Sequence, residues 1–317
     1  MRRSIGVLAM WLLAATVPAA EEDVVIPGPE GPLRGTLVIP ENTFAAALIV
    51  PGSGPTDRNG NNPLGVRADT YRLLARDLAA AGIATLRTDK RGIAGSSTSI
   101  SNADQVRMRD YVVDTRAWSA LLKARTGLTC VWLIGHSEGG LITLVAARRE
   151  PSPYCGVLLL ATPGRPLGQI LREQLRANPA NAPLLVAAEA IISDLEAGKT
   201  VPSERIPEPL SLLFRPPVQP YLMDLMSIDP ATTAAEYAGP LAIVQGTHDL
   251  QVPVSDADRF GHARPGGEVH FIEGMNHVLK SAPADPAGNL AVYNAPGVPL
   301  AQGLVEYFTG FVRRHTP

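Results

Sequence analysis

Short apolar runs alternate with longer amphipathic segments along most of the chain. The runs have the length of buried strands, and the segments between them have helical spacing. Strands and helices that alternate in this way form a mostly parallel sheet with helices on both faces. The predicted strands are 24–26, 33–39, 45–50, 83–87, 131–134, 157–161, 241–244 and 269–272, and the predicted helices of this core are 70–81, 102–125, 141–149 and 300–314.

One segment, from 163 to 239, breaks this rhythm because it contains no clear buried strand. Helical patterns cover 166–177 and 183–197, and a Pro-rich stretch follows them. The segment comes directly after a predicted strand, where α/β sheets carry their ligand-binding loops. We therefore interpret 163–239 as a helical lid or cap insertion, with the core formed by 20–162 and 240–317.

The N-terminus has the pattern of a secretory signal. Arg2 and Arg3 precede an apolar run over 5–17, small residues follow at 17–20, and acidic residues come next at 21–23. The apolar run is short for a bilayer span. We expect 1–19 to be a signal peptide, the mature protein to be periplasmic or secreted, and no stable membrane insertion after cleavage. An uncleaved N-terminal anchor is the alternative.

Export would place the chain's two cysteines in an oxidising compartment. Cys130 and Cys155 each stand just before an apolar run. If those runs are neighbouring parallel strands, both cysteines lie at the same edge of the sheet, which favours a Cys130–Cys155 disulfide. Two reduced, half-buried thiols are the alternative.

Composition narrows the function classes. A formal net charge of −2 and a pI of about 6.3, with no basic run after the first residues, argue against nucleic acid as a partner. With 45% hydrophobic residues over 317 positions, the chain can build a full core without help from a metal. We expect no cofactor and no metal site, and the oligomeric state stays open.

The segment Gly135-His136-Ser137-Glu138-Gly139 matches the pattern G-x-S-x-G. It directly follows one predicted strand and precedes a helix, the context in which such a serine is held at a sharp, strained turn. Small residues must flank that turn, and Gly135, Gly139 and Gly140 provide them. The pattern indicates that Ser137 is a nucleophile. An ordinary glycine-rich strand–helix turn is the alternative.

A serine nucleophile needs a base, and the base needs an orienting carboxylate. With this motif the chain order is serine, acid, histidine. Among the six histidines, His277 follows a strand end by a few residues, which places it at the same sheet edge as Ser137. Asp249 has the matching position after the strand 241–244, and Asp256 and Asp258 are its competitors. We predict His277 as base and Asp249 as its partner.

Acyl transfer also needs two N–H donors for the developing oxyanion. The residue after the nucleophile, Glu138, should supply one from its backbone. The loop after the strand 45–50 should supply the other, and we assign it to Ser53, with Gly54 as the alternative. The polar run 56–62 is expected to brace this loop through side-chain hydrogen bonds, or else to be a solvated loop.

These motifs together resemble bacterial α/β-hydrolases of the serine hydrolase group that includes esterases and the S33 serine aminopeptidase branch. The resemblance covers the core in the expected order and implies the α/β-hydrolase fold with the triad Ser137–Asp249–His277. The segments that carry it are Pro51–Arg58, Asp89-Lys90-Arg91-Gly92, Gly135–Gly139, Gln245–Asp249 and Gly274–His277.

The resemblance implies a hydrolase that cleaves carboxylic esters, and the lid, rich in Leu, Ile and Ala, favours small to medium acyl groups. The expected partner is thus a small-molecule ester. A serine exopeptidase or amidase is the alternative, with Glu173, Glu189 and Glu196 as candidates to hold a substrate amine. A non-catalytic binding protein on this fold is the third reading.

Overall fold

The computed structural model describes residues 19–149 and 153–316. The predicted signal segment 1–19 therefore lies, apart from residue 19, outside the described residues. Within the described part, no helix is both long and apolar enough to cross a bilayer.

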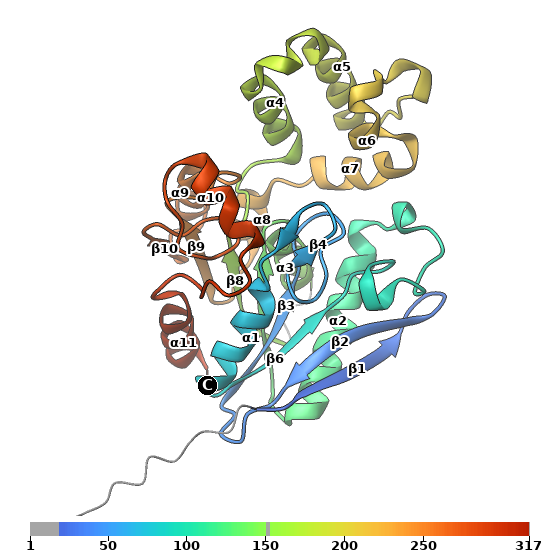
Figure 1. Ribbon diagram of the computed structural model, residues 1–317. Helices are drawn as coiled ribbons and strands as arrows, with labels where there is room; N and C mark the ends of the chain where they lie inside the picture. Colours follow the sequence, from blue (N-terminus) through green and yellow to red (C-terminus); the bar gives the residue numbers. More distant parts are fainter. Residues whose placement is uncertain (1–18, 150–152, 317) are drawn as a thin grey trace, which may run out of the picture.

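An eight-stranded sheet with the order β1-β2-β6-β3-β7-β8-β9-β10 forms the centre of the molecule (Figure 1). From β6 to β10 all neighbours are parallel, and β2 runs antiparallel to both of its neighbours. The mostly parallel sheet predicted from the sequence is confirmed. Its strands are β1 (Glu21–Pro27), β2 (Pro32–Val38), β3 (Ala45–Val50), β6 (Ile83–Thr88), β7 (Val131–His136), β8 (Tyr154–Leu160), β9 (Leu241–Gly246) and β10 (Glu268–Ile272).

Helices cover both faces of the sheet because alternate side chains of each buried strand point to opposite faces. In β3, Leu48 packs in the apolar cluster with α2 and α3, whereas its neighbour Ile49 packs in the cluster with α1 and α11. The central strands are therefore apolar at successive positions. The helices around the sheet are α1 (Thr70–Ala80), α2 (Met108–Thr126), α3 (Glu138–Arg149), α9 (Val254–Ala263), α10 (Pro286–Ala291) and α11 (Leu304–His315).

Between β8 and β9 the chain forms a group of helices, of which α4 to α7 stand apart from the sheet in Figure 1, whereas α8 packs against α3 and α9 of the core. This insertion has an apolar cluster of its own, which includes Ile191, Ile192 and Phe214. The sequence pattern did not predict helices in the Pro-rich stretch, but this stretch contains short ones. Several of these helices have a proline in their first turn, a position where proline is tolerated. The insertion helices are α4 (Leu167–Ala177), α5 (Leu185–Glu196), α6 (Ser211–Phe214), α7 (Gln219–Met226) and α8 (Pro230–Glu236).

Several predicted boundaries were wrong. The helix expected from 102 begins at Met108, because the Asn102 side chain caps a separate 3₁₀ turn by accepting from the Asp104 N–H at 3.0 Å. The helix expected from 141 begins at Glu138. Helix α10 and the small hairpin of β4 (Asn61–Asn62) and β5 (Val66–Arg67) were not predicted.

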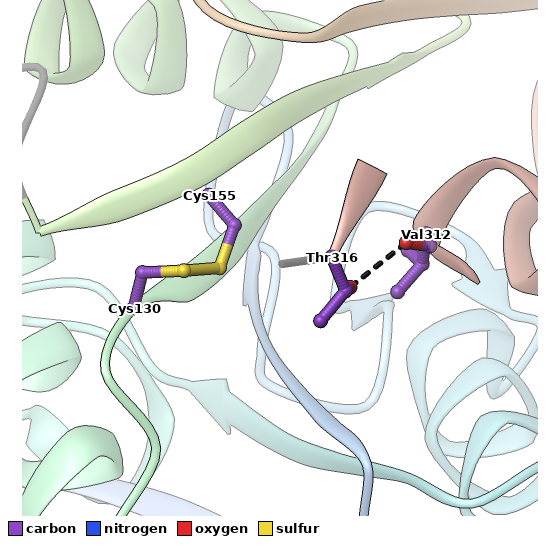
Figure 2. Close-up of a disulfide and its surroundings, with 4 residues drawn as sticks. All are labelled: Cys130, Cys155, Val312 and Thr316. Carbon is purple, nitrogen blue, oxygen red and sulfur yellow. Dashed lines mark hydrogen bonds between the residues drawn. A yellow bond between two sulfur atoms is a disulfide. The ribbon is translucent and has the colours of Figure 1, made fainter. Parts of the chain in front are cut away.

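Cys130 and Cys155 form a disulfide with a Cα–Cα distance of 5.3 Å (Figure 2). Cys130 directly precedes β7, and Cys155 lies near the start of β8. The bond therefore joins the amino ends of two neighbouring parallel strands. The predicted pairing is present in the structure. It lies at the amino ends of the strands (the amino edge of the sheet), whereas Ser137 follows β7 at their carboxyl ends (the carboxyl edge).

Candidate active site

Ser137 occupies the tight turn between β7 and α3. Its φ of 54° lies in the left-handed region, which is unfavourable for a side chain other than glycine and is found at functional turns. The turn is tight enough that a Cβ atom on Gly135 would collide with the Gly139 carbonyl, and one on Gly139 with the Val50 carbonyl. The sequence motif thus has its physical reason here: glycine is needed on both sides so that the strained serine can stand at the strand end.

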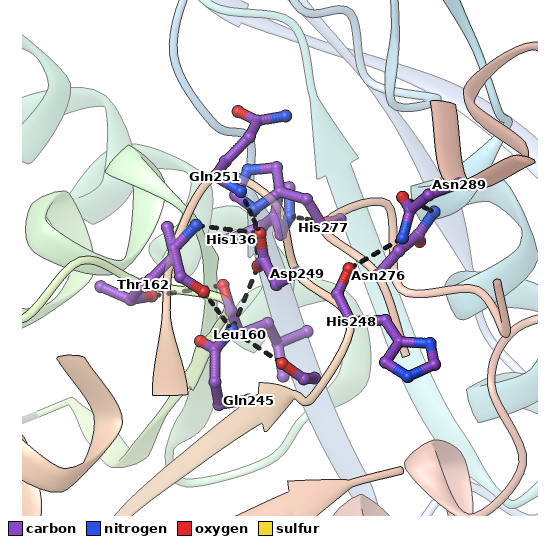
Figure 3. A network of polar contacts seen from close by, with 12 residues as sticks. His136, Leu160, Thr162, Gln245, His248, Asp249, Gln251, Asn276, His277 and Asn289 are labelled. Carbon is purple, nitrogen blue, oxygen red and sulfur yellow. Dashed lines mark hydrogen bonds and ion pairs between the residues drawn. The ribbon is translucent and has the colours of Figure 1, made fainter. Parts of the chain in front are cut away.

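His277 and Asp249 lie side by side (Figure 3), in loops that follow β10 and β9 at the same end of the parallel strands as Ser137. His277 Nδ1 is 2.9 Å from Asp249 Oδ2, and both side chains are almost fully buried. The other Asp249 oxygen accepts from the backbone N–H groups of Gln251 and Val252 at 2.8 and 2.9 Å. The carboxylate is therefore fixed on both sides, with one oxygen aimed at the imidazole.

The electrostatics of this pair keep Asp249 ionised. Burial raises the pKa of Asp249, but His277 and the hydrogen bonds from Val252 and Gln251 outweigh burial and hold that pKa below its usual value. An ionised carboxylate fixes the Nδ1–H tautomer of His277, which leaves Nε2 free to accept a proton. The pair thus has the form of a general base and its orienting group.

The competing carboxylates are placed elsewhere. Asp256 accepts from the Gly164 N–H and from the Arg165 guanidinium, both at 2.9 Å, where the chain leaves the core for the insertion. Asp258 is exposed on α9. The structure thus brings Asp249 to His277 and leaves the other two in different surroundings.

His136, which precedes the nucleophile, links two loops of the site in a way that the sequence did not predict. Its Nε2 lies 2.8 Å from the His277 carbonyl oxygen, and its Nδ1 lies 2.7 Å from the Tyr71 hydroxyl. Since a carbonyl only accepts, Nε2 carries the hydrogen and Nδ1 accepts from Tyr71. The Tyr71 oxygen in turn accepts from the Gly52 N–H at 3.0 Å. One chain of hydrogen bonds therefore runs from the loop after β3 to the backbone of His277.

This chain works only with neutral imidazole at His136. Burial lowers the pKa of His136 to about 3, and the nearby His277 acts in the same direction. The ring lies next to that of His277, with centroids 4.9 Å apart and the ring planes tilted by 49°. The available signal in the sequence was a histidine at the end of a buried, otherwise apolar strand, because a buried imidazole needs partners on both nitrogens.

The two residues assigned to the oxyanion hole flank the nucleophile from neighbouring strands. Glu138 is the first residue of α3, so its N–H has no carbonyl one turn earlier in the helix to bind. Ser53 is exposed in the loop after β3, and its carbonyl accepts from the Thr56 hydroxyl at 2.8 Å. Asp57 braces the same loop by accepting from the Asn59 and Asn61 N–H groups. Because β3 and β7 are paired in the sheet, the loop that carries Ser53 adjoins the turn before Glu138, and a Cβ atom on Gly52 would lie 3.2 Å from the Ser137 Cβ.

The acidic residues considered for binding a substrate amine are all paired with arginine on the insertion. Glu173 pairs with Arg165. Glu189 and Glu196 both lie 2.6 Å from the Arg172 guanidinium. Each carboxylate is thus already neutralised by a cation of the insertion itself.

The chain is similar in sequence to a family of serine hydrolases and to a known esterase. A family model described as "Serine aminopeptidase, S33" matches residues 64–281, well over half of the chain. Esterase EstD of Thermotoga maritima is 27% identical over 272 residues, which cover 82% of this chain and 60% of that protein. The chain thus spans about 60% of the length of this curated relative.

Solved structures show the same fold. The alpha/beta hydrolase GrgF from Penicillium sp. sh18 superposes with a TM-score of 0.61 at 17% identity, covering 94% of this chain and 99% of that one. Est1E from Butyrivibrio proteoclasticus, solved with ferulic acid bound, gives 0.56 at 18% identity, covering 92% and 96%. At such identities the likeness establishes the fold, and the α/β-hydrolase fold predicted from the sequence is confirmed.

Proposed function

Because the chain belongs to the serine aminopeptidase S33 family, we propose that it is a serine hydrolase that cleaves carboxylic esters of small to medium acyl groups. The observation that carries the proposal is the buried His277–Asp249 hydrogen bond of 2.9 Å, at the sheet edge where Ser137 stands in a strained turn. A base with a fixed tautomer, at the same end of the strands as a serine in such a turn, is the arrangement that acyl transfer requires.

The proposed reaction has two halves. Ser137 Oγ attacks the ester carbonyl carbon while His277 Nε2 takes its proton, and the negative charge moves to the carbonyl oxygen. The backbone N–H groups of Ser53 and Glu138 bind that oxygen. His277 then protonates the leaving alcohol, and the acyl group stays on Ser137. In the second half a water gives a proton to His277 and attacks the acyl carbon. The bond from that carbon to Ser137 Oγ then breaks, His277 returns the proton to Ser137, and the acid leaves.

Esters are favoured over aminoacyl substrates by the charges of the insertion. An exopeptidase needs a free carboxylate to hold the substrate's amine, but Glu173, Glu189 and Glu196 are each paired with arginine. The name of the curated relative, an esterase, points in the same direction. Hydrolysis of aminoacyl-naphthylamides in preference to acyl esters of equal size would reverse this choice.

We propose further that the protein is exported and that 163–239 acts as a lid. The Cys130–Cys155 disulfide supports export, because disulfides persist in oxidising compartments. For the lid, the support is a hydrogen bond of 2.9 Å from Tyr221 on α7 to the Glu138 carboxylate next to the nucleophile. Fractionation of cells that express the full chain tests the first, and deletion of 167–226 with a substrate panel tests the second.

Ser137→Ala is the direct test of the reaction. Without the nucleophile, we expect kcat on a short p-nitrophenyl ester to fall by about 10⁴-fold or more. Labelling by a fluorophosphonate probe should disappear. Ser101→Ala, at an exposed serine bonded to Glu30, is the matched control and should keep both signals. Labelling of Ser137→Ala, or a wild-type protein that neither turns over esters nor labels, would refute the proposed function.

A further inference from the structure

A buried lysine, Lys90, touches both halves of the predicted oxyanion hole. It lies two residues after β6, the strand next to β3, and its side chain is only 6% exposed. Its Nζ donates to the Gly52 carbonyl oxygen at 2.7 Å and lies 3.8 Å from Glu138 Oε1. Gly52 belongs to the loop that carries Ser53, and Glu138 follows the nucleophile. One side chain therefore spans the two peptide segments that would bind the oxyanion.

The contact with Gly52 fixes the direction of the Ser53 N–H. The Gly52 carbonyl and the Ser53 N–H belong to one peptide group, which is planar and trans, so the two bonds point in opposite directions. A lysine that holds the oxygen on one side thereby aims the N–H at the other side. The peptide group before it is fixed as well, because the Gly52 N–H donates to Tyr71. A loop with glycine at positions 52 and 54 needs such restraints, since glycine leaves its backbone free to rotate.

The contact with Glu138 restrains the residue that carries the second oxyanion donor. Its carboxylate is 15% exposed, lies beside Lys90 and accepts from the Tyr221 hydroxyl at 2.9 Å. Lys90 also lies over the ring of Tyr111, 5.6 Å from its centroid, and Tyr111 packs edge-on against Tyr221. The Gly52 carbonyl, the Glu138 carboxylate and the Tyr111 ring therefore surround the ammonium group and replace the water that would solvate it at the surface.

We infer that Lys90 is a positioning residue that sets the geometry of the oxyanion hole by holding the Gly52 carbonyl and the Glu138 carboxylate at once. Lys90 touches neither the nucleophile nor the base, so it acts through the backbone donors of Ser53 and Glu138. The inference rests on the proposed function, because it concerns the transition state of that reaction. It explains why a charged side chain is buried at the end of β6, where an apolar one would otherwise be expected.

The test replaces Lys90 with methionine, which has a similar length but no donor and no charge. Loss of one oxyanion donor costs about 10²- to 10³-fold in kcat, so a misaimed donor should cost about 10- to 100-fold. KM should change by less than about threefold, because the ground-state ester gains little from the hole. A trifluoromethyl ketone, which adds Ser137 to form an oxyanion, should bind more weakly by a factor close to the loss in kcat.

Lys123→Met is the matched control. Lys123 lies in the last turn of α2, whereas Tyr111, which contacts Lys90, lies in its first turn, so about 18 Å of helix separate Lys123 from the site. It should match the wild type in kcat and in ketone affinity. Lys90→Gln is the second variant should Lys90→Met fold poorly: it keeps a polar head in the same space but is too short to reach Gly52 and Glu138 together, so the same losses are expected.

Two results would overturn the inference. One is a folded Lys90 variant with kcat within threefold of the wild type. The other is a loss of kcat with unchanged ketone affinity, because the defect would then lie outside the oxyanion hole. Both are distinguishable from failure of the proposed function, which would leave the wild-type protein and the Lys123→Met control inactive as well.

Discussion

The two ends of strand β7 carry opposite kinds of chemistry. At its amino end Cys130 is bonded to Cys155 of the neighbouring strand. At its carboxyl end, six residues of strand further on, Ser137 stands in a left-handed turn. The first feature is a covalent restraint that favours the folded chain. The second is a backbone conformation that a serine disfavours, so the surrounding fold must hold it in place.

The difference follows from the direction of parallel strands. Because β3, β6, β7, β9 and β10 all end at the same edge, their following loops converge there. Each loop contributes a polar group that would be costly to bury alone. The disulfide lies at the amino ends of β7 and β8, the far ends of these strands from Ser137, so it can restrain the chain without touching the site. Activity and stability should therefore respond separately to changes at the two edges.

After Ser137→Ala, the largest expected effect is at the carboxyl edge, for Asp249→Asn. The amide keeps the volume but removes the charge that selects the His277 tautomer, so kcat should fall by about 10³- to 10⁴-fold. Ester turnover measured beside thermal unfolding tests this. The matched control is Asp258→Asn, on the exposed side of α9. If Asp249→Asn keeps wild-type kcat, the acid of the pair has been misassigned.

The next effect is at the amino edge, for the double variant Cys130→Ala/Cys155→Ala. Loss of a cross-link over a sequence separation of 25 should lower the free energy of unfolding by about 3 kcal/mol in the chain-entropy model. Because the bond lies at the other end of β7, kcat should stay within twofold of the wild type. Denaturant unfolding and ester turnover on the same samples measure both. A parallel drop in kcat would show that the two edges are not independent.

The smallest expected effect is on the pH dependence of stability, through His136 at the carboxyl edge. His136 has an unfolded pKa near 6.5 and a folded pKa of about 3, so between these values the unfolded chain binds more protons than the folded one. Its contribution to stability is complete above pH 6.5 and is lost as the pH falls, by about 1.4 kcal/mol per pH unit. His136→Gln keeps a donor and an acceptor but does not titrate, so its stability should fall less steeply between pH 6.5 and 4.5.

Urea unfolding of both proteins over that range measures the difference in slope. The pKa of His270 is also lowered by burial, but this residue is present in both proteins and cancels in the comparison. The pKa of Asp249 is lowered from a value of 3.8, so its contribution falls below this pH range. Equal slopes would mean that His136 is not held neutral by the fold.

Much of the fold was predictable because local patterns decided it. The strand 45–50 was predicted to the residue, since helices cover both faces of a central strand and successive side chains must therefore be apolar. The insertion was harder to read, because its short helices begin at prolines and pack against one another without a repeating pattern. Its Arg–Glu pairs, such as Arg172 with Glu196, were invisible in the sequence because a helix–helix contact creates them.

By itself the sequence determined the main strands and helices of the core and the turn at Ser137, because glycine spacing and apolar runs act over a few neighbouring residues. It also placed Asp249 and His277 after strand ends, and the order of those strands makes them meet. Only the tertiary structure decided what surrounds them: His136 next to His277, Tyr71 between Gly52 and His136, and Lys90 on the Gly52 carbonyl. These contacts join residues far apart in the chain, and their geometry depends on how the strands twist and pack.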